Sequence, residues 1–218
     1  MDEAIPSTQC LFPPQRSGAG AVIFEDDHLL VVNKPAGIPT HTPEPEICWG
    51  WYEYFHWRNP NSEKLRLLHR LDRETSGVLL FAKSREASRE LARQWEAGLV
   101  FKRYLFASRR KPRKTVWKME RPIGGQRAVT EFRALEKGGE FYGIEASPKT
   151  GRTHQVRIHA AASGVPVVGD REHGDPQDDW PLLLHAAEFG CRPPGAKADT
   201  HFSVPLPETF SAVSTTEA

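Results

Sequence analysis

Short apolar runs that alternate with turn-forming residues are the feature that most constrains the fold of this chain. Seven runs have the length and composition of β-strands, at residues 21–24, 28–32, 77–82, 101–108, 129–135, 141–146 and 182–186. Two stretches predict helices, at 84–97 between a Ser84 cap and Gly98, and at 154–163 before Gly164. Because the strands outnumber the helices and many neighbours can pair antiparallel, we expect an α+β fold.

No linker long enough to separate two domains interrupts the 218 residues, so we expect one domain over residues 21–210. Residues 1–20 combine several Pro and Gly with few apolar anchors, which predicts a poorly ordered arm, and residues 211–218 read as a short tail. No apolar run approaches the ~20 residues needed to cross a bilayer, and the acidic start at Met1–Ala4 lacks the features of a signal peptide. We therefore expect a cytoplasmic protein without membrane contact.

The net charge of +1 hides an uneven distribution of charged residues. Residues 102–121 contain nine Lys and Arg against one Glu, whereas acidic residues are dense in the segment 170–179. One face of the protein can therefore be strongly positive, as nucleic-acid binding requires. A basic run is also typical of an ordinary solvated loop, so this pattern indicates nucleic acid without deciding for it.

Several common active-site signatures are absent from the sequence. The three cysteines are widely spaced and form no Cys-x-x-Cys pair, which argues against a disulfide framework or a structural zinc site. The histidines include no His-Glu-x-x-His motif, and His154 and His159 are five residues apart, off a shared helical face. Walker A, Gly-x-Ser-x-Gly and Gly-x-Gly-x-x-Gly motifs are also missing. We therefore expect no metal site.

Asp72 lies in the first of two dense polar clusters, between an expected strand end at residues 67–71 and a turn closed by Thr75–Gly77. Arg70 and Arg73 flank it, and their positive charges favour a carboxylate. A carboxylate in a loop between rigid elements is suited to act as a nucleophile or general base. The alternative is structural, because a turn Asp often accepts hydrogen bonds from its own turn.

The second polar cluster, Gly151–His159, contains two arginines near the start of an expected helix. Arg152 stands at the mouth of the helix, whereas Arg157 lies inside it and needs a partner if it is buried. Asp72 is a candidate partner, and the alternative is an amphipathic helix with both arginines in solvent. Tyr104, on an expected strand, can stack on a nucleobase or pack in the core. The aromatic run 48–57 favours a helix packed on the sheet over an RNA-stacking surface.

The order of these clusters along the chain closely resembles that of the RluA-type RNA pseudouridine synthases. The stretch around Asp72 matches the catalytic motif of that family, and Tyr104 matches its tyrosine motif. The resemblance extends from about Ala21 to Phe210 and is carried by Glu25–Pro39, His69–Gly77, Lys102–Tyr104, Thr150–His159, Gly164–Asp170, Leu183–Ala186 and Pro205–Pro207.

The resemblance implies a single α+β catalytic domain built around a large, mainly antiparallel sheet with flanking helices. It also implies an isomerase that detaches the uracil of a uridine from C1′ and rejoins it through C5, without metal or organic cofactor. Asp72 is then the essential carboxylate, Tyr104 packs on the base, and Arg157 pairs with Asp72. Arg157 is preferred to Arg152 for this pairing because the Gln-Val-Arg end of the block matches the wider superfamily better.

The expected partner is structured RNA, either tRNA or rRNA, bound by a monomer, and DNA is not expected. Arg70 resembles the residue that fills the space left by a flipped nucleotide. Arg152 is expected at a phosphate, and Lys102, His154 and Gln155 complete the expected RNA-binding set. The ~20-residue arm is too short for the S4 domain of many relatives, which predicts the form without one. The alternatives are a non-catalytic RNA-binding protein that kept the fold and, in third place, a glycosidase, which usually needs two carboxylates.

Overall fold

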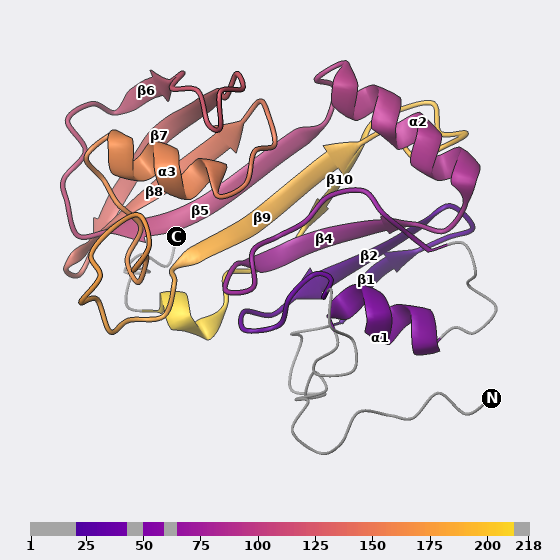
Figure 1. Ribbon diagram of the computed structural model, residues 1–218, viewed down its shortest axis with the longest axis horizontal. Helices are drawn as coiled ribbons and strands as arrows, with labels where there is room; N and C mark the ends of the chain where they lie inside the picture. The colour runs from indigo at the N-terminus through magenta and orange to yellow at the C-terminus, as the bar shows by residue number, and fades with distance from the viewer. Residues whose placement is uncertain (1–20, 43–49, 59–64, 212–218) are drawn as a thin grey trace.

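The computed structural model describes residues 21–42, 50–58 and 65–211 (Figure 1). The arm predicted for residues 1–20 and all but the first residue of the predicted tail lie outside the described residues. The described chain forms one large sheet with helices packed on it, which confirms the expected α+β fold.

Ten strands of the described chain belong to this sheet, whose main path runs β1-β2-β4-β9-β5-β8-β7-β6, with β3 beside β4 and β10 beside β9. These pairings are antiparallel except that of β4 with β9, so the sheet is mainly antiparallel as predicted. In chain order the strands are β1 (Val22–Glu25), β2 (Leu29–Lys34), β3 (Arg66–Leu67), β4 (Ser76–Ala82), β5 (Phe101–Ser108), β6 (Val116–Met119), β7 (Thr130–Gly138), β8 (Phe141–Pro148), β9 (Leu184–Cys191) and β10 (Thr200–Ser203).

The parallel pairing of β4 with β9 decides where the loops before these two strands meet. Ser76 lies opposite His185 and Gly77 opposite Ala186, so both strands start at the same edge of the sheet. The side chains of Ser76 and His185 also share a buried hydrogen bond of 2.8 Å. The loop that precedes β4 contains Asp72, and the long segment that precedes β9 begins just after α3. Two parts of the chain about a hundred residues apart therefore come together at this edge.

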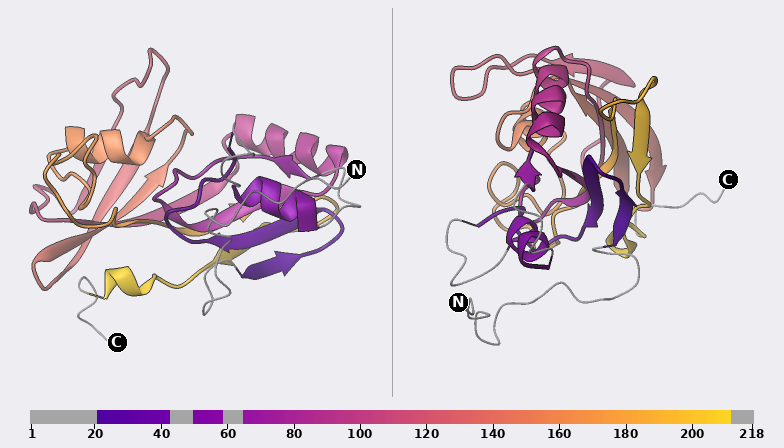
Figure 2. Two further views of the ribbon diagram at one scale, coloured as in Figure 1. Left: turned by 60° about the horizontal axis from the view of Figure 1, so that its bottom comes forward. Right: turned by 90° about the vertical axis from the view of Figure 1, so that its right-hand side faces the viewer.

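The helices are α1 (Trp51–Arg58), α2 (Arg85–Glu96) and α3 (Gln155–Ala162), followed by the 3₁₀ turn η1 (Glu208–Phe210). Ser84 caps α2 as predicted, because its hydroxyl accepts the Ala87 N–H at 3.0 Å. Figure 2 shows α2 and α3 on the same side of the sheet, near its two ends. Within the described residues, none of these helices has the length and apolar character that a membrane span requires.

Strand β4 shows how the helices are held on the sheet, since all seven of its residues are buried. Alternate side chains of a strand point to opposite faces. Leu80 accordingly packs in a cluster with Leu91 of α2, whereas Phe81 packs in another cluster with Phe55 of α1. Burial of each such side chain contributes about 1.5–3 kcal/mol. The aromatic helix predicted near residues 48–57 thus does pack its rings on the sheet where the structure describes it.

Several expected boundaries were wrong. The strand expected at 67–71 is only the two-residue β3, because the residues that follow form a loop. The strand expected at 182–186 is β9, which continues to Cys191 through the buried Phe189. The strands expected at 129–135 and 141–146 are joined by two residues, because β7 continues to Gly138 and β8 starts at Phe141. The unpredicted β6 and β10 are four-residue strands with several exposed or polar residues, which give a weak apolar signal.

Gly77 is expected to be indispensable for the parallel pairing of β4 with β9. Its φ is +118°, and a Cβ at this position would lie 2.2 Å from the carbonyl oxygen of Ala186. Gly98 is a matched control, because it also has a positive φ (+69°) but its Cβ would meet nothing within 4 Å. In urea unfolding we expect Gly98→Ala to cost about 1 kcal/mol and Gly77→Ala at least about 1 kcal/mol more. Equal losses in the two variants would contradict the close approach.

Candidate active site

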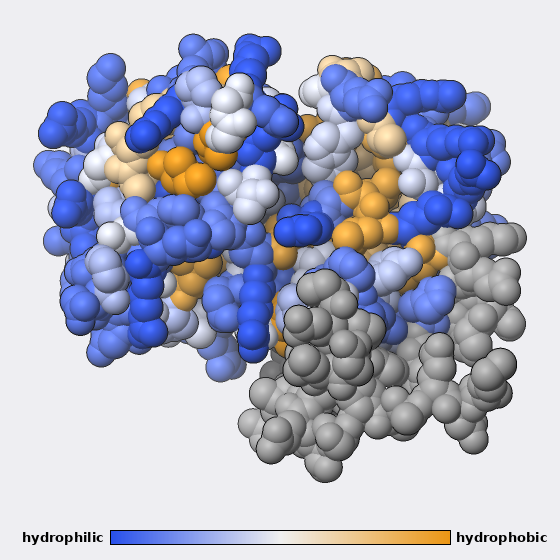
Figure 3. All heavy atoms as spheres, viewed as in Figure 1, coloured by the Kyte–Doolittle hydropathy of each residue, from blue (hydrophilic) through white to orange (hydrophobic). Residues whose placement is uncertain are grey.

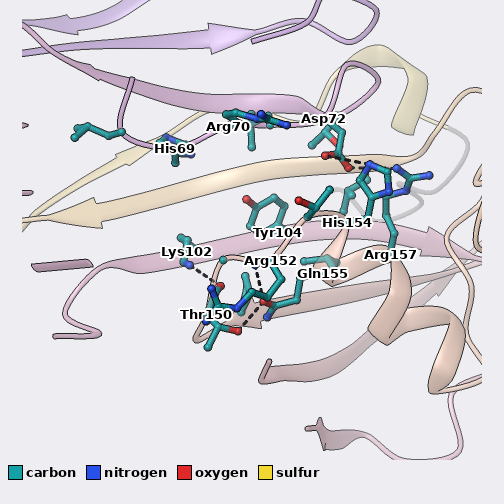
Figure 4. A pocket seen from close by; sticks show the side chains of 18 of the residues that line it. His69, Arg70, Asp72, Lys102, Tyr104, Thr150, Arg152, His154, Gln155 and Arg157 are labelled. Atoms are coloured by element: carbon teal, nitrogen blue, oxygen red, sulfur yellow. Dashed lines mark hydrogen bonds and ion pairs between the residues drawn. The ribbon is translucent and has the colours of Figure 1, made fainter. Parts of the chain in front are cut away.

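A pocket of about 410 Å³ opens between α2 and the start of α3, over strands β5 and β9. Trp95 of α2 and Leu184 of β9 contribute to its wall. In the space-filling view, apolar side chains show in the hollow between the α2 and α3 sides of the molecule (Figure 3). All eight residues that the sequence nominated line this one pocket (Figure 4), namely Arg70, Asp72, Lys102, Tyr104, Arg152, His154, Gln155 and Arg157.

Asp72 is held by its backbone, which leaves its carboxylate free to face the pocket. Thr75 donates its N–H to the Asp72 carbonyl at 3.1 Å, and the buried Thr40 hydroxyl both donates to the Leu71 carbonyl and accepts the Leu71 N–H. The Asp72 side chain is 29% exposed, and its Oδ2 lies 3.3 Å from Nη1 of Arg157. The turn is therefore closed by the Asp72 carbonyl and not by its carboxylate, which removes the main argument for a purely structural Asp.

Lys34 at the end of β2, which the sequence analysis missed, ties the loop after β2 to the loop that contains Asp72. Its fully buried ammonium donates to the carbonyl oxygens of Pro35 (2.8 Å), Ile38 (2.7 Å) and Arg73 (3.0 Å). Burial lowers the pKa of Lys34 to about 7, against the raising effect of nearby carboxylates. The signal in the sequence was a lysine at the end of an apolar strand, a position where burial is costly unless every N–H is used.

Arg157 contacts Asp72, as predicted. Its strongest partner, however, is Asp170, which was not among the residues nominated from the sequence. Its Nε and Nη2 donate to the two carboxylate oxygens of Asp170 at 2.9 and 2.7 Å, while Nη1 donates to Asp72. Burial disfavours the guanidinium, but the hydrogen bond and charge of Asp170, with those of Asp72, prevail and raise the Arg157 pKa above its usual value. The bidentate pair therefore fixes a permanently charged Arg157 against Asp72.

Asp170 is almost fully buried, with its side chain 1% exposed. Burial alone would raise its pKa, but the hydrogen bonds from Arg157 and from the His173 backbone lower it below the ordinary value. Asp170 precedes β9, whereas Asp72 precedes β4. The parallel pairing of these strands therefore brings both carboxylates to one arginine.

Tyr104 lies on β5 opposite Ala146 of β8 and Ala186 of β9, so both its strand partners are small. Its ring is half-buried, packs against two core clusters and lines the pocket. Burial raises the pKa of its hydroxyl well above the usual value, and the charge of Asp72 raises it further. Tyr104 thus presents a neutral aromatic surface to the pocket, which confirms its packing role, while its stacking role stays a prediction.

Gln155 shapes the pocket wall with every hydrogen-bonding group of its buried amide engaged. Its Oε1 accepts from the Thr150 hydroxyl (2.6 Å) and the Arg152 N–H (3.0 Å). Its Nε2 donates to the Val129 carbonyl and the Thr130 hydroxyl. The amide is therefore committed to joining the loop before α3 to β7.

Lys102 and Arg152 differ strongly in exposure. Lys102 is only 8% exposed, donates to the Thr150 carbonyl at 2.9 Å and lies 5.1 Å over the Trp95 ring. Burial lowers the Lys102 pKa to about 8. Arg152 is exposed and donates to the Arg127 carbonyl at 3.2 Å, and Arg70 is exposed at the pocket edge. The two arginines are therefore the cations of the site with the best access to a ligand backbone.

His69, at the start of the loop that contains Asp72, is held as a neutral ring. It stacks on Phe189, with ring centroids 5.2 Å apart, and its Nε2 accepts the Leu80 N–H at 3.1 Å. Burial, with a smaller contribution from Lys102, lowers the His69 pKa to about 3. His69 thus anchors one end of the loop to the sheet, while Thr40 and Lys34 hold the other.

The chain is similar to proteins of known family. Residues 28–162, more than half of the chain, match the model of the RNA pseudouridylate synthase family. The chain belongs to this family. Ribosomal large subunit pseudouridine synthase C of Vibrio vulnificus is 33% identical over 213 residues, 88% of this chain and 67% of that protein. The protein of the same name from Escherichia coli K12 is 33% identical over 216 residues, 87% of this chain and 67% of that protein.

These relatives confirm the RluA-type resemblance seen in the sequence, and the chain spans about two thirds of their length. Solved structures agree on the fold of the synthase. Human RNA pseudouridylate synthase domain containing 4 has a TM-score of 0.71 at 22% identity, over 88% of this chain and 90% of that one. Human RNA pseudouridylate synthase domain containing 1 has a TM-score of 0.72 at 24% identity, over 88% and 85%.

Asp170→Asn is expected to impair the synthase by releasing Arg157, although Asp170 does not line the pocket. Removal of one partner of a buried ion pair costs about 3 kcal/mol or more, and a misplaced neighbour of a reacting group costs about 100-fold in rate. We expect losses of these sizes in urea unfolding and in pseudouridine formation. Asp175→Asn is the matched control, because this exposed carboxylate of the same segment accepts only the Gln177 N–H among the described contacts. Activity within about threefold of the unsubstituted chain in Asp170→Asn would contradict the positioning role.

Proposed function

We propose that this synthase converts uridine in structured RNA to pseudouridine with Asp72 as its essential carboxylate. The observation that carries the proposal is the placement of Asp72 at the mouth of the pocket, 3.3 Å from a fixed, charged Arg157 and facing the ring of Tyr104. In this arrangement Asp72 drives cleavage of the C1′–N1 bond of the uridine, and the uracil rejoins the ribose through C5. Asp72, Arg157 and Tyr104 all belong to this one chain.

The composition of the pocket wall favours an isomerase over a glycosidase. Asp72 is the one carboxylate among the described residues that line the pocket, whereas a glycosidase usually needs two. Asp170 and Glu172 are close by and accept hydrogen bonds from Arg157, but neither lines the pocket. A non-catalytic RNA-binding protein would have no use for a charged arginine that is fixed by one carboxylate and directed at another.

The shape of the site is suited to a nucleotide that has left its helix. A base cannot be reached inside a stack, and a side chain that stacks on the extruded base rewards its extrusion. Tyr104 offers such a ring inside the pocket, and the exposed Arg70 at its edge can occupy the space that the nucleotide leaves. Arg152, also exposed, is available to a phosphate. His154 and Lys102 complete the polar wall against which the flipped nucleotide would lie.

The identity of the substrate RNA is also part of this proposal. The relatives above are named for the large ribosomal subunit, which makes rRNA the first substrate to test and tRNA the second.

Part of the basic run at residues 102–121 is paired within the protein, since Arg103 contacts Glu188 and Arg109 contacts Asp178. The remaining cations between β5 and β6 are exposed and can bind phosphates with salt-sensitive affinity, at Arg110, Lys111, Arg113 and Lys114. We assign this activity to a monomer in the cytoplasm.

Asp72→Asn tests the proposal with little change in shape. We expect pseudouridine formation on large-subunit rRNA fragments to fall by at least about 1,000-fold, because the amide cannot replace a catalytic carboxylate. Folding should persist, since Arg157 keeps its bidentate contact with Asp170. The measurements are pseudouridine yield, urea unfolding and RNA affinity on the same preparation.

Asp27→Asn, an exposed substitution between β1 and β2, serves as the control and should leave all three measurements unchanged. A variant at Asp72 that remains folded, binds RNA and still forms pseudouridine at the normal rate would overturn the assignment.

A further inference from the structure

A compact cluster of two histidines and a glutamate lies beside the catalytic pocket. His154 stands at the start of α3, and Glu172 and His173 lie in the segment that follows Asp170. Nδ1 of His154 is 2.9 Å from Nε2 of His173, and Oε1 of Glu172 is 3.3 and 3.4 Å from these two nitrogens. Three potential metal ligands therefore form a nearly regular triangle.

We propose that His154, Glu172 and His173 form a binding site for Zn²⁺ at the mouth of the pocket. Zinc binds histidine nitrogen and carboxylate oxygen at about 2.0–2.2 Å in tetrahedral geometry, which separates its ligands by about 3.3–3.6 Å. The two distances to Oε1 of Glu172 lie in this range, whereas the two histidine nitrogens are at hydrogen-bond distance and would move apart by about 0.4 Å to share a zinc ion. Two histidines and one carboxylate leave the fourth position of the metal open. The site does not depend on the proposed function, because it rests on these three side chains alone.

The charges around the cluster also suit a divalent cation. Asp72, Asp170 and Glu172 bring three negative charges, against which Arg157 supplies one positive charge, and all four side chains are linked by short contacts. With neutral histidines the group carries a formal charge of −2, which one Zn²⁺ would balance. The cluster is open to solvent, because the side chains of His154 and His173 are 24% and 21% exposed and that of Glu172 is 56% exposed.

The surroundings already orient two of the ligands. Oε2 of Glu172 accepts from Nη2 of Arg157 at 3.1 Å, so the other oxygen is directed at the histidines. His154 has a φ of +53° and is the one residue other than glycine with a positive φ in the described part of the chain. Strain of this kind persists where the surrounding structure holds a residue in a required position. The backbone of His154 is therefore set in an uncommon conformation at the point where its ring meets Glu172 and His173.

Metal binding would act on the catalytic carboxylate through His154. Coordination by Nδ1 requires the proton of the neutral ring to lie on Nε2, which is 3.8 Å from Oδ1 of Asp72. A bound Zn²⁺ would thus hold the N–H of His154 on the side of the ring that faces Asp72. It would also join the start of α3 to the segment before β9, across the mouth of the pocket.

Titration of the tag-free, chelator-treated full chain with ZnCl₂ alone, followed by calorimetry and by thermal unfolding, tests this site. We expect one Zn²⁺ per chain and a melting temperature raised by about 5 °C at a hundredfold excess over Kd. His173→Asn should weaken binding at least about tenfold and remove this rise. Co²⁺ in place of Zn²⁺ should give the visible absorption of a four-coordinate site in the unsubstituted chain only.

His201→Asn is the matched control, because His201 also contacts a glutamate, Glu188 at 2.6 Å, but lies on β10 away from the cluster. It should bind Zn²⁺ like the unsubstituted chain, and melting temperatures in chelator will show that both variants are folded. Absence of saturable binding at one Zn²⁺ per chain, or equal affinity in His173→Asn and His201→Asn, would overturn the proposal. Neither result depends on RNA or on pseudouridine formation, so the failure of this site is distinct from the failure of the proposed function.

Discussion

The ion pair between Arg157 and two aspartates is the interaction around which this protein is arranged. Arg157 is held in two hydrogen bonds by Asp170 and directs its remaining nitrogen at Asp72. A buried pair of this kind is costly to desolvate, and the loss of one partner leaves an uncompensated charge. Its geometry therefore has to be built by the rest of the fold. The parallel contact of β4 with β9 supplies that geometry, because the loops before these two strands contain the two aspartates.

The neighbouring contacts can be understood as supports for this arrangement. Lys34 donates to three carbonyl oxygens and joins the loop after β2 to the loop of Asp72, while His69 anchors the other end of that loop on Phe189. Gln155 uses its whole amide to hold the loop before α3. All the side-chain hydrogen-bonding groups of Lys34 and Gln155 are therefore occupied within the protein. The consequence is a pocket whose polar wall is fixed before RNA arrives, as electrostatic preorganisation requires.

Prediction from the sequence succeeded where a residue pattern is local and failed where the tertiary structure decides. The Ser84 cap, the α2 helix and the apolar core of β4 follow from spacing and composition, and the family resemblance identified Asp72 and a partner for it. The sequence analysis missed Asp170, because its role depends on the pairing of β4 with β9. The internal hydrogen bonds of the Gln155 amide could not be foreseen either, because they join residues of separate elements, and its nomination as an RNA contact stays a prediction. His173 was overlooked as a neighbour of His154 because the two are 19 residues apart, outside any local motif.

The chemical change that Asp72 is proposed to cause in RNA is measurable base by base. Pseudouridines in total RNA can be mapped in cells that lack this gene and in the same cells supplied with either the unsubstituted chain or Asp72→Asn. We expect that at least one pseudouridine of rRNA or tRNA disappears with the gene, returns with the unsubstituted chain and stays absent with Asp72→Asn. An unchanged map in the cells without the gene, or a full return with Asp72→Asn, would contradict this expectation.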